Sequence, residues 1–327
     1  MAKSALDLID ECDKFPYYHD DPALYTNHLT NYHAFKVSDC DSILGYILNT
    51  TVNAFPWPKD CWQIDSAART VTLLTPHFPA DTTSVKKAEL RSELISRTLA
   101  AAVEKDTFKV LRGWRNELYP VYGPGNEVLL SMERSATPLF GVVTYGVHMT
   151  AYTRDSKTGE IKIWVPRRSA SKQTYPSMLD NTVGGGMSTG ELPGECAVRE
   201  AMEEASIPEE IVKSKAQMCG AVTYFYMRDA RAGGETGLLQ PEVEYIYDIE
   251  LDASVVPQPC DTEVEDFRLW GVEEVKEAMW NSQFKPNAAI VLLDFFIRHG
   301  IMTPENEKNY LEIVTRLHRK FEFPIPK

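Results

Sequence analysis

The segment that most constrains the fold of this chain is an acidic stretch that follows three consecutive glycines. Glu200, Glu203 and Glu204 are spaced i, i+3 and i+4, so on a helix they share one face and repel one another. A hard divalent cation would relieve that repulsion, since carboxylate oxygens with retained waters are the ligands that Mg²⁺ prefers. Gly184 and Gly185 allow backbone N–H groups to approach a phosphate closely. The stretch therefore predicts a helix that binds a cation beside a phosphate; the alternative is a solvated acidic face.

The buried face of this helix is expected to consist of Val198, Ala201, Met202 and Ala205.

The surroundings of the three acids resemble the Nudix box. That signature reads Gly, five residues, Glu, seven residues, Arg-Glu, an apolar residue, any residue, Glu-Glu, any residue, Gly and an apolar residue. Ser206 replaces its last glycine, the expected helix C-cap, and Ala201 is smaller than the usual aliphatic residue. The positions in register are Gly185, Glu191, Arg199, Glu200, Ala201, Glu203, Glu204 and Ile207.

The resemblance implies a metal-assisted attack of water on a phosphorus of an organic diphosphate. It implies that Glu200, Glu203 and Glu204 bind Mg²⁺ or Mn²⁺, and that Glu200 or Glu204 also orients water. Arg199 and Glu191 would pair to hold the loop to the helix. The proton acceptor is expected to be a glutamate outside the box, and three candidates remain open, each of which could instead be a solvated acid: Glu244, Glu263 and Glu265.

Outside the box, the chain is similar to the fungal and plant Nudix enzymes that are related to the front part of certain thiamine pyrophosphokinases. That subgroup implies hydrolysis of thiamine diphosphate and of damaged forms such as oxythiamine and oxothiamine diphosphate, to the monophosphate and phosphate, as a form of metabolite repair. The segments that carry this similarity are Phe140–Val142, Tyr145–His148, Trp164–Ser169, Lys172, Tyr175–Asn181, Gly113–Tyr119, Glu133–Arg134, Phe295–Gly300 and Thr303–Glu305.

Several side chains near the glycines are candidates for substrate binding. Arg167, Arg168 and Lys172 follow a strand and precede the glycine loop, so they could bind a diphosphate, although a solubilising turn is an equal alternative. Phe140 and Tyr145 could stack on an aromatic ring, although aromatic residues at strand spacing more often belong to a core.

The order of predicted elements indicates an α/β fold. Strands that bracket helices, with hairpins present, favour an α/β/α sandwich with a mixed sheet over residues 134–327. A smaller α+β domain of unassigned role is expected over residues 1–133, either as one wall of the pocket or as a homodimer contact. The predicted elements are a hairpin over 62–74, a helix over 86–105, a hairpin over 140–166, strands over 220–226 and 243–251, and a last helix capped by Thr303 with Pro304 in its first turn.

Charge and targeting signals limit the partners and the compartment. With 34 Lys and Arg against 47 Asp and Glu, the formal net charge is −13, so neither nucleic acid nor an anionic membrane is an expected partner. The six cysteines form no Cys-x-x-Cys pair and the N-terminal residues are acidic, so we expect reduced thiols and a cytoplasmic protein. The expected partner is a small-molecule diphosphate.

Two other functions remain open. One is a Nudix hydrolase for another nucleoside-diphosphate derivative such as ADP-ribose; an isoprenyl diphosphate isomerase ranks lower, because Cys196 lies on the box helix itself. The other is a catalytically silent Nudix binding module, although this chain keeps every carboxylate of the box.

Overall fold

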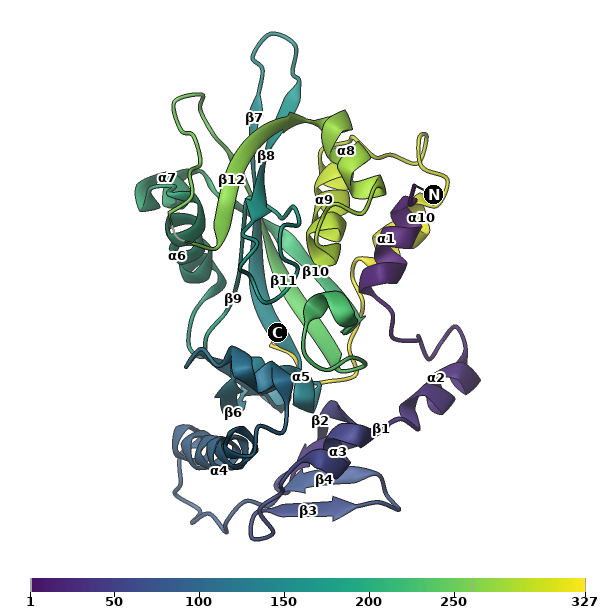
Figure 1. The fold of residues 1–327 in the computed structure, drawn as a ribbon, viewed down its shortest axis with the longest axis vertical. Helices are drawn as coiled ribbons and strands as arrows, with labels where there is room; N and C mark the ends of the chain where they lie inside the picture. The colour runs from purple at the N-terminus through teal and green to yellow at the C-terminus, as the bar shows by residue number, and fades with distance from the viewer. Residues whose placement is uncertain (1, 261, 327) are drawn as a thin grey trace.

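A six-stranded mixed sheet forms the centre of the C-terminal half of the molecule (Figure 1). The computed structural model describes residues 2–260 and 262–326. The strand order is β10-β11-β7-β8-β12, with β9 paired to the first half of β7. Strand β7 is parallel to β11 and antiparallel to β8 and β9, so the sheet is mixed. The strands are β7 Thr144–Arg154, β8 Ile161–Arg168, β9 Val183–Gly186, β10 Gln217–Met227, β11 Leu239–Glu250 and β12 Val264–Gly271.

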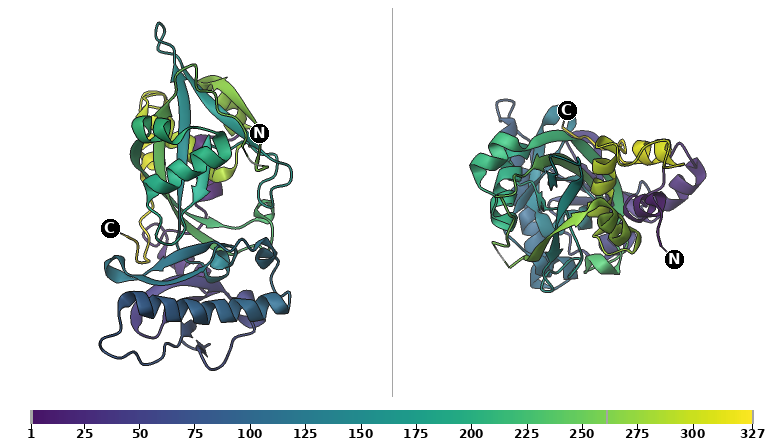
Figure 2. Two further views of the ribbon diagram at one scale, coloured as in Figure 1. Left: turned by 90° about the vertical axis from the view of Figure 1, so that its left-hand side faces the viewer. Right: turned by 90° about the horizontal axis from the view of Figure 1, so that it is seen from above.

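Helices cover both faces of this sheet, which confirms the predicted α/β/α sandwich (Figures 1 and 2). Alternate residues of β7, including Tyr145, Val147 and Met149, pack toward α6 and α7. The opposite face is covered by α9, which is apolar around most of its circumference, together with α8 and α1. The covering helices are α6 Pro193–Ala205 and α7 Glu209–Lys215 on one face, and α8 Val272–Trp280, α9 Pro286–Arg298 and α1 Ala5–Cys12 on the other.

The N-terminal region forms a second, smaller α+β layer below the sandwich (Figure 2). Its four strands have the order β2-β1-β4-β3, with β1 parallel to β4, and the predicted hairpin is β3–β4. The predicted long helix is α4, which begins after its N-cap Thr83. The elements are α2 Pro22–Leu29, β1 Tyr32–Val37, β2 Cys40–Leu48, α3 Asn49–Ala54, β3 Trp62–Asp65, β4 Thr70–Leu73, α4 Ser84–Glu104, β5 Leu118–Tyr122 and β6 Val128–Glu133.

The first residues of the chain belong to the sandwich rather than to the N-terminal layer. Leu8 and Ile9 of α1 are buried in the core that also contains α9. The predicted division at residue 133 therefore does not hold for α1, because its apolar face is covered by the C-terminal half. Next to α1, the ring of Phe15 stacks on Phe225, with centroids 4.2 Å apart. Asp13 also accepts a hydrogen bond of 2.9 Å from Arg319, so both ends of the chain meet beside the sheet.

Two predicted elements differ from the structure. The predicted helix from Thr303 is wrong, because Asn306 holds residues 301–306 in a turn: its Oδ1 accepts the Thr303 N–H at 2.8 Å, and its amide donates to the Ile301 carbonyl at 3.0 Å. The last helix, α10, is Tyr310–Arg316. The predicted strand over 140–153 begins only at Thr144, since residues 137–140 form the short helix α5, Thr137–Phe140.

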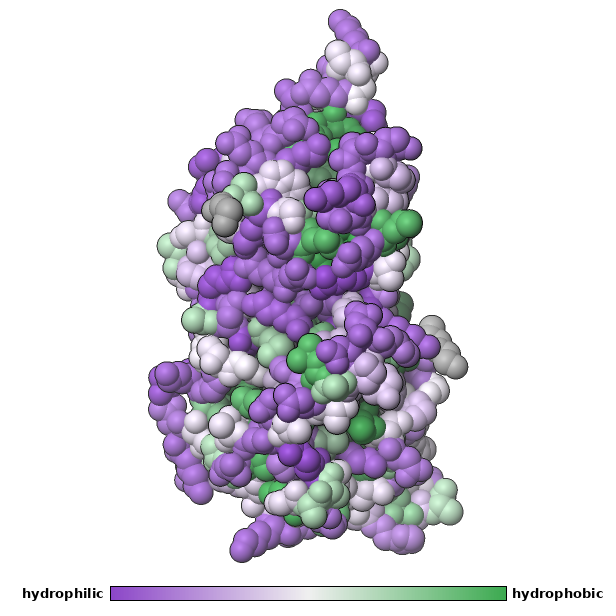
Figure 3. All heavy atoms as spheres, turned by 90° about the vertical axis from the view of Figure 1, so that its right-hand side faces the viewer, coloured by the Kyte–Doolittle hydropathy of each residue, from purple (hydrophilic) through white to green (hydrophobic). Residues whose placement is uncertain are grey.

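The surface carries no sign of a membrane-spanning segment in the part of the chain that is described. No helix there combines the length and the apolar character that a bilayer crossing requires. The face drawn in Figure 3 is mainly hydrophilic, with hydrophobic residues in small, separate patches.

Candidate active site

The box forms a strand, a loop and a helix at one edge of the sheet. Strand β9 pairs with β7, so that Gly185 lies opposite Val147 and Gly186 opposite Gly146. Helix α6 begins at Pro193, and Glu195 of its first turn accepts the Leu192 N–H at 3.0 Å. At its other end Ser206 adopts a left-handed conformation, with φ of 53°. The position at which the box has glycine is therefore a helix C-cap, as its place in the signature implies.

Arg199 connects the loop to the carboxylates of the helix. Its Nε and Nη2 donate to the two oxygens of Glu191 at 2.7 and 3.0 Å. Its Nη1 donates to Glu200 at 2.8 Å and to Glu203 at 3.2 Å. The predicted contact between Arg199 and Glu191 is thus present, and the same guanidinium offsets part of the repulsion among the box acids.

Glu200 is buried against the glycine strand, contrary to the predicted pattern of the helix. A Cβ atom at Gly185 would lie 1.9 Å from the Glu200 Cδ, so the carboxylate fills the space that a side chain would need. Burial raises the pKa of Glu200. Met202, which the spacing placed in the core, is instead 42% exposed. The predicted buried stripe is wrong at Met202, because the glycines leave room for an acid rather than an apolar side chain.

Glu204 is held at the start of β9. It accepts the Gly184 N–H at 3.0 Å, while burial and the charge of Glu200 raise its pKa to about 8. Glu203 is exposed. As the side chains stand, no three His, Cys, Asp or Glu residues of the described chain are grouped closely enough to hold a metal ion. The donors nevertheless suit a hard divalent cation: they are oxygen ligands, and burial raises the pKa of both Glu200 and Glu204 despite the nearby cations Arg199 and Lys172.

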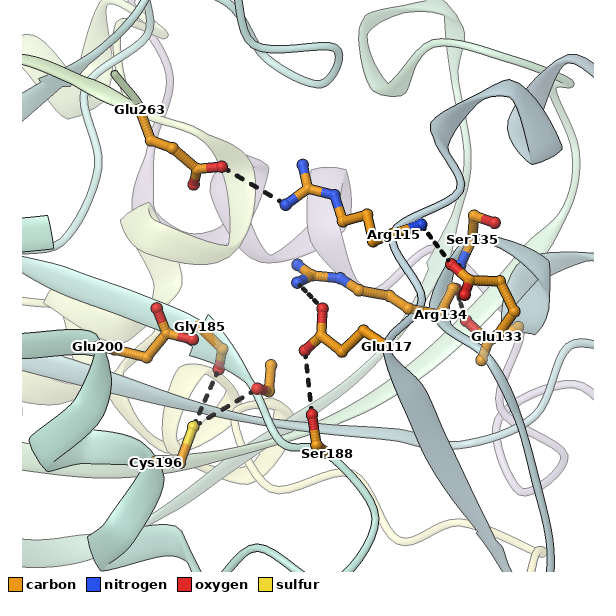
Figure 4. A network of polar contacts seen from close by, with 12 residues as sticks. Arg115, Glu117, Glu133, Arg134, Ser135, Gly185, Ser188, Cys196, Glu200 and Glu263 are labelled. Atoms are coloured by element: carbon orange, nitrogen blue, oxygen red, sulfur yellow. Dashed lines mark hydrogen bonds and ion pairs between the residues drawn. The ribbon is translucent and has the colours of Figure 1, made fainter. Parts of the chain in front are cut away.

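Of the three candidate proton acceptors, Glu263 is the one linked to the box, through Lys172, whose charge also acts on Glu204. Glu263 forms ion pairs with Lys172 and, at 3.5 Å, with Arg115 (Figure 4). Burial alone would raise the pKa of Glu263, but Lys172 and Arg115 outweigh it and lower the pKa, so the carboxylate is an anion at neutral pH. Glu265 is exposed at a bulge of β12, and no ion pair within the described residues joins it to the box.

Glu244 lies on the opposite face of the sheet from α6. Neighbouring residues of β9 face opposite sides, since Gly185 faces Glu200 and Gly184 faces His148. Glu244 belongs to the His148 side: its Oε1 lies 3.7 Å from the His148 Nε2 and 2.9 Å from the Tyr224 hydroxyl. His148 is buried, and its Nδ1 lies 2.7 Å from the Asn181 Oδ1. The sheet therefore separates Glu244 from the box carboxylates.

A cavity of about 460 Å³ lies between the sandwich and the N-terminal region. One side is lined by Gly184–Gly186, at the box, and by the acids Glu242 and Glu244. Tyr145 also lines it, and the Tyr145 hydroxyl is buried without a hydrogen-bond partner in the described structure. The cations that line the cavity are Lys109, Arg112, Arg115, Arg134, Arg228 and Lys285.

Two predicted substrate-binding residues are placed where they cannot contact a substrate. Arg168 is buried, with its guanidinium donating to Asp180 at 2.7 Å and to the Tyr175 and Thr174 carbonyls at 3.1 and 3.0 Å. Phe140 is fully buried in the N-terminal core, where its ring lies 5.2 Å from that of Phe35. Both predictions are wrong, because these side chains are already enclosed by the fold.

The other two predicted basic residues do not line the cavity and have partners within the protein. Arg167 donates to the Ser177 carbonyl at 2.9 Å, and Lys172 is engaged by Glu263. Two groups were missed by the reasoning from sequence. Glu242 could have been found from its i, i+2 spacing to Glu244, which puts the two acids on one face of β11. Arg134 carried no local signal, because its place beside the box depends on the tertiary fold.

Comparison with known proteins supports the resemblance of the site to the Nudix box. The NUDIX domain model matches residues 144–289, and a domain of unknown function, DUF4743, matches residues 19–144. The uncharacterized protein YJR142W of Saccharomyces cerevisiae is 33% identical over 330 residues, which covers 98% of this chain and 92% of the yeast protein. Nudix hydrolase 20, chloroplastic, of Arabidopsis thaliana is 36% identical over 238 residues, or 72% of this chain. Nudix hydrolase 24, chloroplastic, of the same plant is 33% identical over 233 residues, or 71% of this chain. The matches span 60% of each plant protein.

The site and these matches define a hydrolase that acts on pyrophosphate bonds. The chain belongs to the Nudix family, whose enzymes act on nucleoside diphosphate derivatives and generally use divalent metals such as Mg²⁺ or Mn²⁺. Among solved structures, DR0079 from Deinococcus radiodurans has a TM-score of 0.38 and 19% identity over 54% of this chain and 97% of its own. The family assignment rests on the sequence matches and not on such structural likeness.

Proposed function

We propose that the protein hydrolyses the diphosphate of thiamine diphosphate and of its damaged forms, oxythiamine and oxothiamine diphosphate, to the monophosphate and phosphate with Mg²⁺. The observation that carries this proposal is the charge distribution of the cavity. The lining includes the glycines of the box, several arginines and the carboxylates of Glu242 and Glu244. A substrate with a diphosphate at one end and a cation at the other is complementary to both.

The acidic part suits a cationic ring. Thiamine carries a permanently charged thiazolium ring, and Glu244 has a lowered pKa: burial alone would raise it, but His148 and Lys285 outweigh burial. The hydroxyl of Tyr224 donates toward these carboxylates and orients them. Tyr226 also lines the cavity and offers an aromatic ring on which a heterocycle can stack.

The box supplies the hydrolytic part. Glu200, Glu203 and Glu204 would hold the divalent cation, which polarises phosphoryl oxygens and activates water when it is bound. Glu263, an anion with a lowered pKa, is the proton acceptor that we favour, because it lies beside the box whereas Glu244 lies across the sheet. Arg199 keeps Glu200 and Glu203 in place through its hydrogen bonds.

The proposal extends to the setting of the enzyme. We propose a cytoplasmic protein that acts on a small diphosphate and binds neither nucleic acid nor membrane, which its net charge of −13 supports. A homodimer remains a prediction, and sedimentation of the purified protein tests it.

A substrate panel tests the activity. Purified protein with Mg²⁺ is incubated with thiamine, oxythiamine and oxothiamine diphosphates and with ADP-ribose, and products are identified by chromatography. We expect kcat/KM for at least one thiamine form to exceed that for ADP-ribose by about tenfold or more, the effect of one charge-assisted contact. Preference for ADP-ribose would assign another Nudix substrate, and no turnover with Mg²⁺ or Mn²⁺ would indicate a binding module.

A variant tests the acidic part separately. Glu242→Gln is expected to raise KM for thiamine diphosphate about tenfold. The same variant should leave KM nearly unchanged for oxothiamine diphosphate, whose oxidised ring is uncharged. An equal effect on both substrates would show that Glu242 does not recognise the ring charge.

A further inference from the structure

Two arginines of the N-terminal region reach the Nudix site. Arg115 follows the short helical segment Lys109–Gly113, and Arg134 follows strand β6. Figure 4 shows both guanidinium groups directed away from their own backbone, toward Glu263 and the side of the site where Glu200 lies. Arg115 pairs with Glu263 at 3.5 Å, and the charge of Arg134 opposes the burial that raises the pKa of Glu200.

A single buried carboxylate fixes the backbone of both segments. Glu133 is 1% exposed, and its Oε1 accepts the Arg115 N–H at 2.9 Å and the Ser135 N–H at 3.3 Å. The Arg134 N–H donates to the Glu117 carbonyl at 2.8 Å. The two arginines are therefore set at a defined separation before any ligand binds, which reduces the entropy lost on binding.

The same region is attached directly to the loop between β9 and α6. The Thr189 N–H donates to the Leu118 carbonyl at 2.8 Å, and the Ser188 hydroxyl lies 3.3 Å from Glu117. Tyr119 lies against Gly186 so closely that a Cβ atom there would be 1.5 Å from its hydroxyl oxygen. These contacts fix the position of the segments that carry Arg115 and Arg134 relative to the glycine strand.

The present partners of the arginines are acids that a diphosphate would replace. Arg134 pairs with Glu117 at 2.9 Å, and both of these side chains are partly exposed, as are those of Arg115 and Glu263. Guanidinium groups bind phosphoryl oxygens through two parallel hydrogen bonds, a geometry that lysine cannot reproduce. Arg115 and Arg134 line the cavity together with the box glycines Gly184–Gly186, and the charge of Arg134 acts on Glu200, so a diphosphate held at the glycines would lie within reach of both guanidinium groups.

We propose that Arg115 and Arg134 bind the phosphoryl oxygens of the substrate diphosphate, so that the DUF4743 region supplies part of the Nudix active site. The inference rests on the diphosphate part of the proposed function and is independent of the organic group. The competing role is a structural clamp, in which the two arginines only hold Glu117 and Glu263.

Binding of methylenediphosphonate, a diphosphate analogue whose P–C–P bridge cannot be hydrolysed, tests the proposal by titration calorimetry with Mg²⁺ and the full chain. Arg115→Ala and Arg134→Ala should each raise Kd about tenfold, and the double variant about a hundredfold. Arg134→Lys should recover only part of the loss. Arg97→Ala is the control, because Arg97 pairs with Asp60 on the exposed side of α4 and should leave Kd unchanged.

Kinetics separate this inference from the choice of substrate. The same variants are assayed on whichever diphosphate the wild type hydrolyses, whether a thiamine form or ADP-ribose, so that failure of the thiamine proposal leaves the arginine test intact. We expect KM to rise with each alanine variant while the thermal midpoint stays near that of the wild type. Unchanged Kd and KM, with or without a lower midpoint, would assign the structural clamp, and no binding by the wild type would also overturn the proposal.

Discussion

The carboxylate of Glu200 occupies the space in which a side chain of Gly185 would lie. The Glu200 Cδ would be 1.9 Å from a Cβ atom at that position, and no rotation of a backbone hydrogen-bonded to β7 relieves so short a contact. The glycine of the signature is therefore required for the position of Glu200, the acid that we propose binds the cation.

Gly185→Ala should displace Glu200 and lower kcat/KM by about a hundredfold or more, because loss of one positioned charge contact near the reacting group costs about 3 kcal/mol. Gly194→Ala is a matched control, since a Cβ atom there meets only the Tyr247 hydroxyl, at 3.9 Å. That control should keep full activity and gain up to about 1 kcal/mol of stability from its helical position. Equal activity of both variants would show that Glu200 tolerates displacement.

Glu204 should make the metal-free protein less stable as the pH rises. Its pKa is about 8 in the folded state against a usual 4.5, so folding takes up a proton between these values and stability falls as pH increases through that window. Mg²⁺ should reverse this loss, with about 1.4 kcal/mol gained for each tenfold excess over Kd.

Calorimetric scans at pH 6 and pH 8, with EDTA or with Mg²⁺, measure this effect. Glu204→Gln should remove both the decline with pH and most of the Mg²⁺ response, and hydrolysis should fall by at least about a hundredfold. Glu210→Gln, an exposed position on α7, serves as control. A Glu204→Gln protein that responds to Mg²⁺ as the wild type does would contradict the ligand assignment.

The buried pair Arg168–Asp180 should govern stability in acid. Burial alone would raise the pKa of Asp180, but Lys285 and Arg168 outweigh it and lower the pKa to about 2. A depressed pKa contributes stability above the unfolded value of 3.8, and this contribution, about 2 kcal/mol, is lost between about pH 4 and pH 2.

Urea unfolding at pH 7 and pH 3 tests the pair. Asp180→Asn should cost about 3 kcal/mol at pH 7, because it leaves Arg168 buried without a counter-charge, and should weaken the acid dependence. Asp60→Asn, which breaks an exposed pair with Arg97, should cost less than about 1 kcal/mol. Similar costs for the two variants would mean that burial does not strengthen the Arg168 pair.

Ser206→Gly should stabilise the protein without changing its activity. Ser206 ends α6 with φ of 53°, a conformation that costs a residue with a Cβ atom about 1 kcal/mol relative to glycine. Thermal unfolding should show that gain for Ser206→Gly and none for Ser206→Ala. A destabilised glycine variant would mean that the serine side chain contributes more than the backbone strain removes.

The box could be located from sequence because its chemistry is encoded by local spacing. The contact between Arg199 and Glu191 and the C-cap at Ser206 both lie within one short segment. The glycines before them were expected as a loop but form strand β9, which is paired to β7. The sandwich was also predictable, since β10 and β11 carry clear strand patterns. Such features depend on neighbours along the chain, which a single sequence displays.

The errors concern residues whose role depends on distant partners. From sequence alone, Arg168 resembles a phosphate-binding residue. In the structure its guanidinium is enclosed by Asp180 and by two backbone carbonyls. Phe140 lies in a segment of strand-like composition but is buried by aromatic residues of the N-terminal layer. Glu263 could not be preferred over Glu265 from sequence, because its pairing with Lys172, 91 residues away, exists only in the folded chain.

The contact between Asp13 and Arg319 joins residues that are 306 positions apart. This contact can therefore form only when both of these distant segments are available to fold together. Before that, the apolar face of α1 has no core to pack against, and the ring of Phe15 lacks its stacking partner Phe225. Because contacts between residues so far apart in sequence are the slowest to close, α1 is expected to be among the last elements of the sandwich to pack.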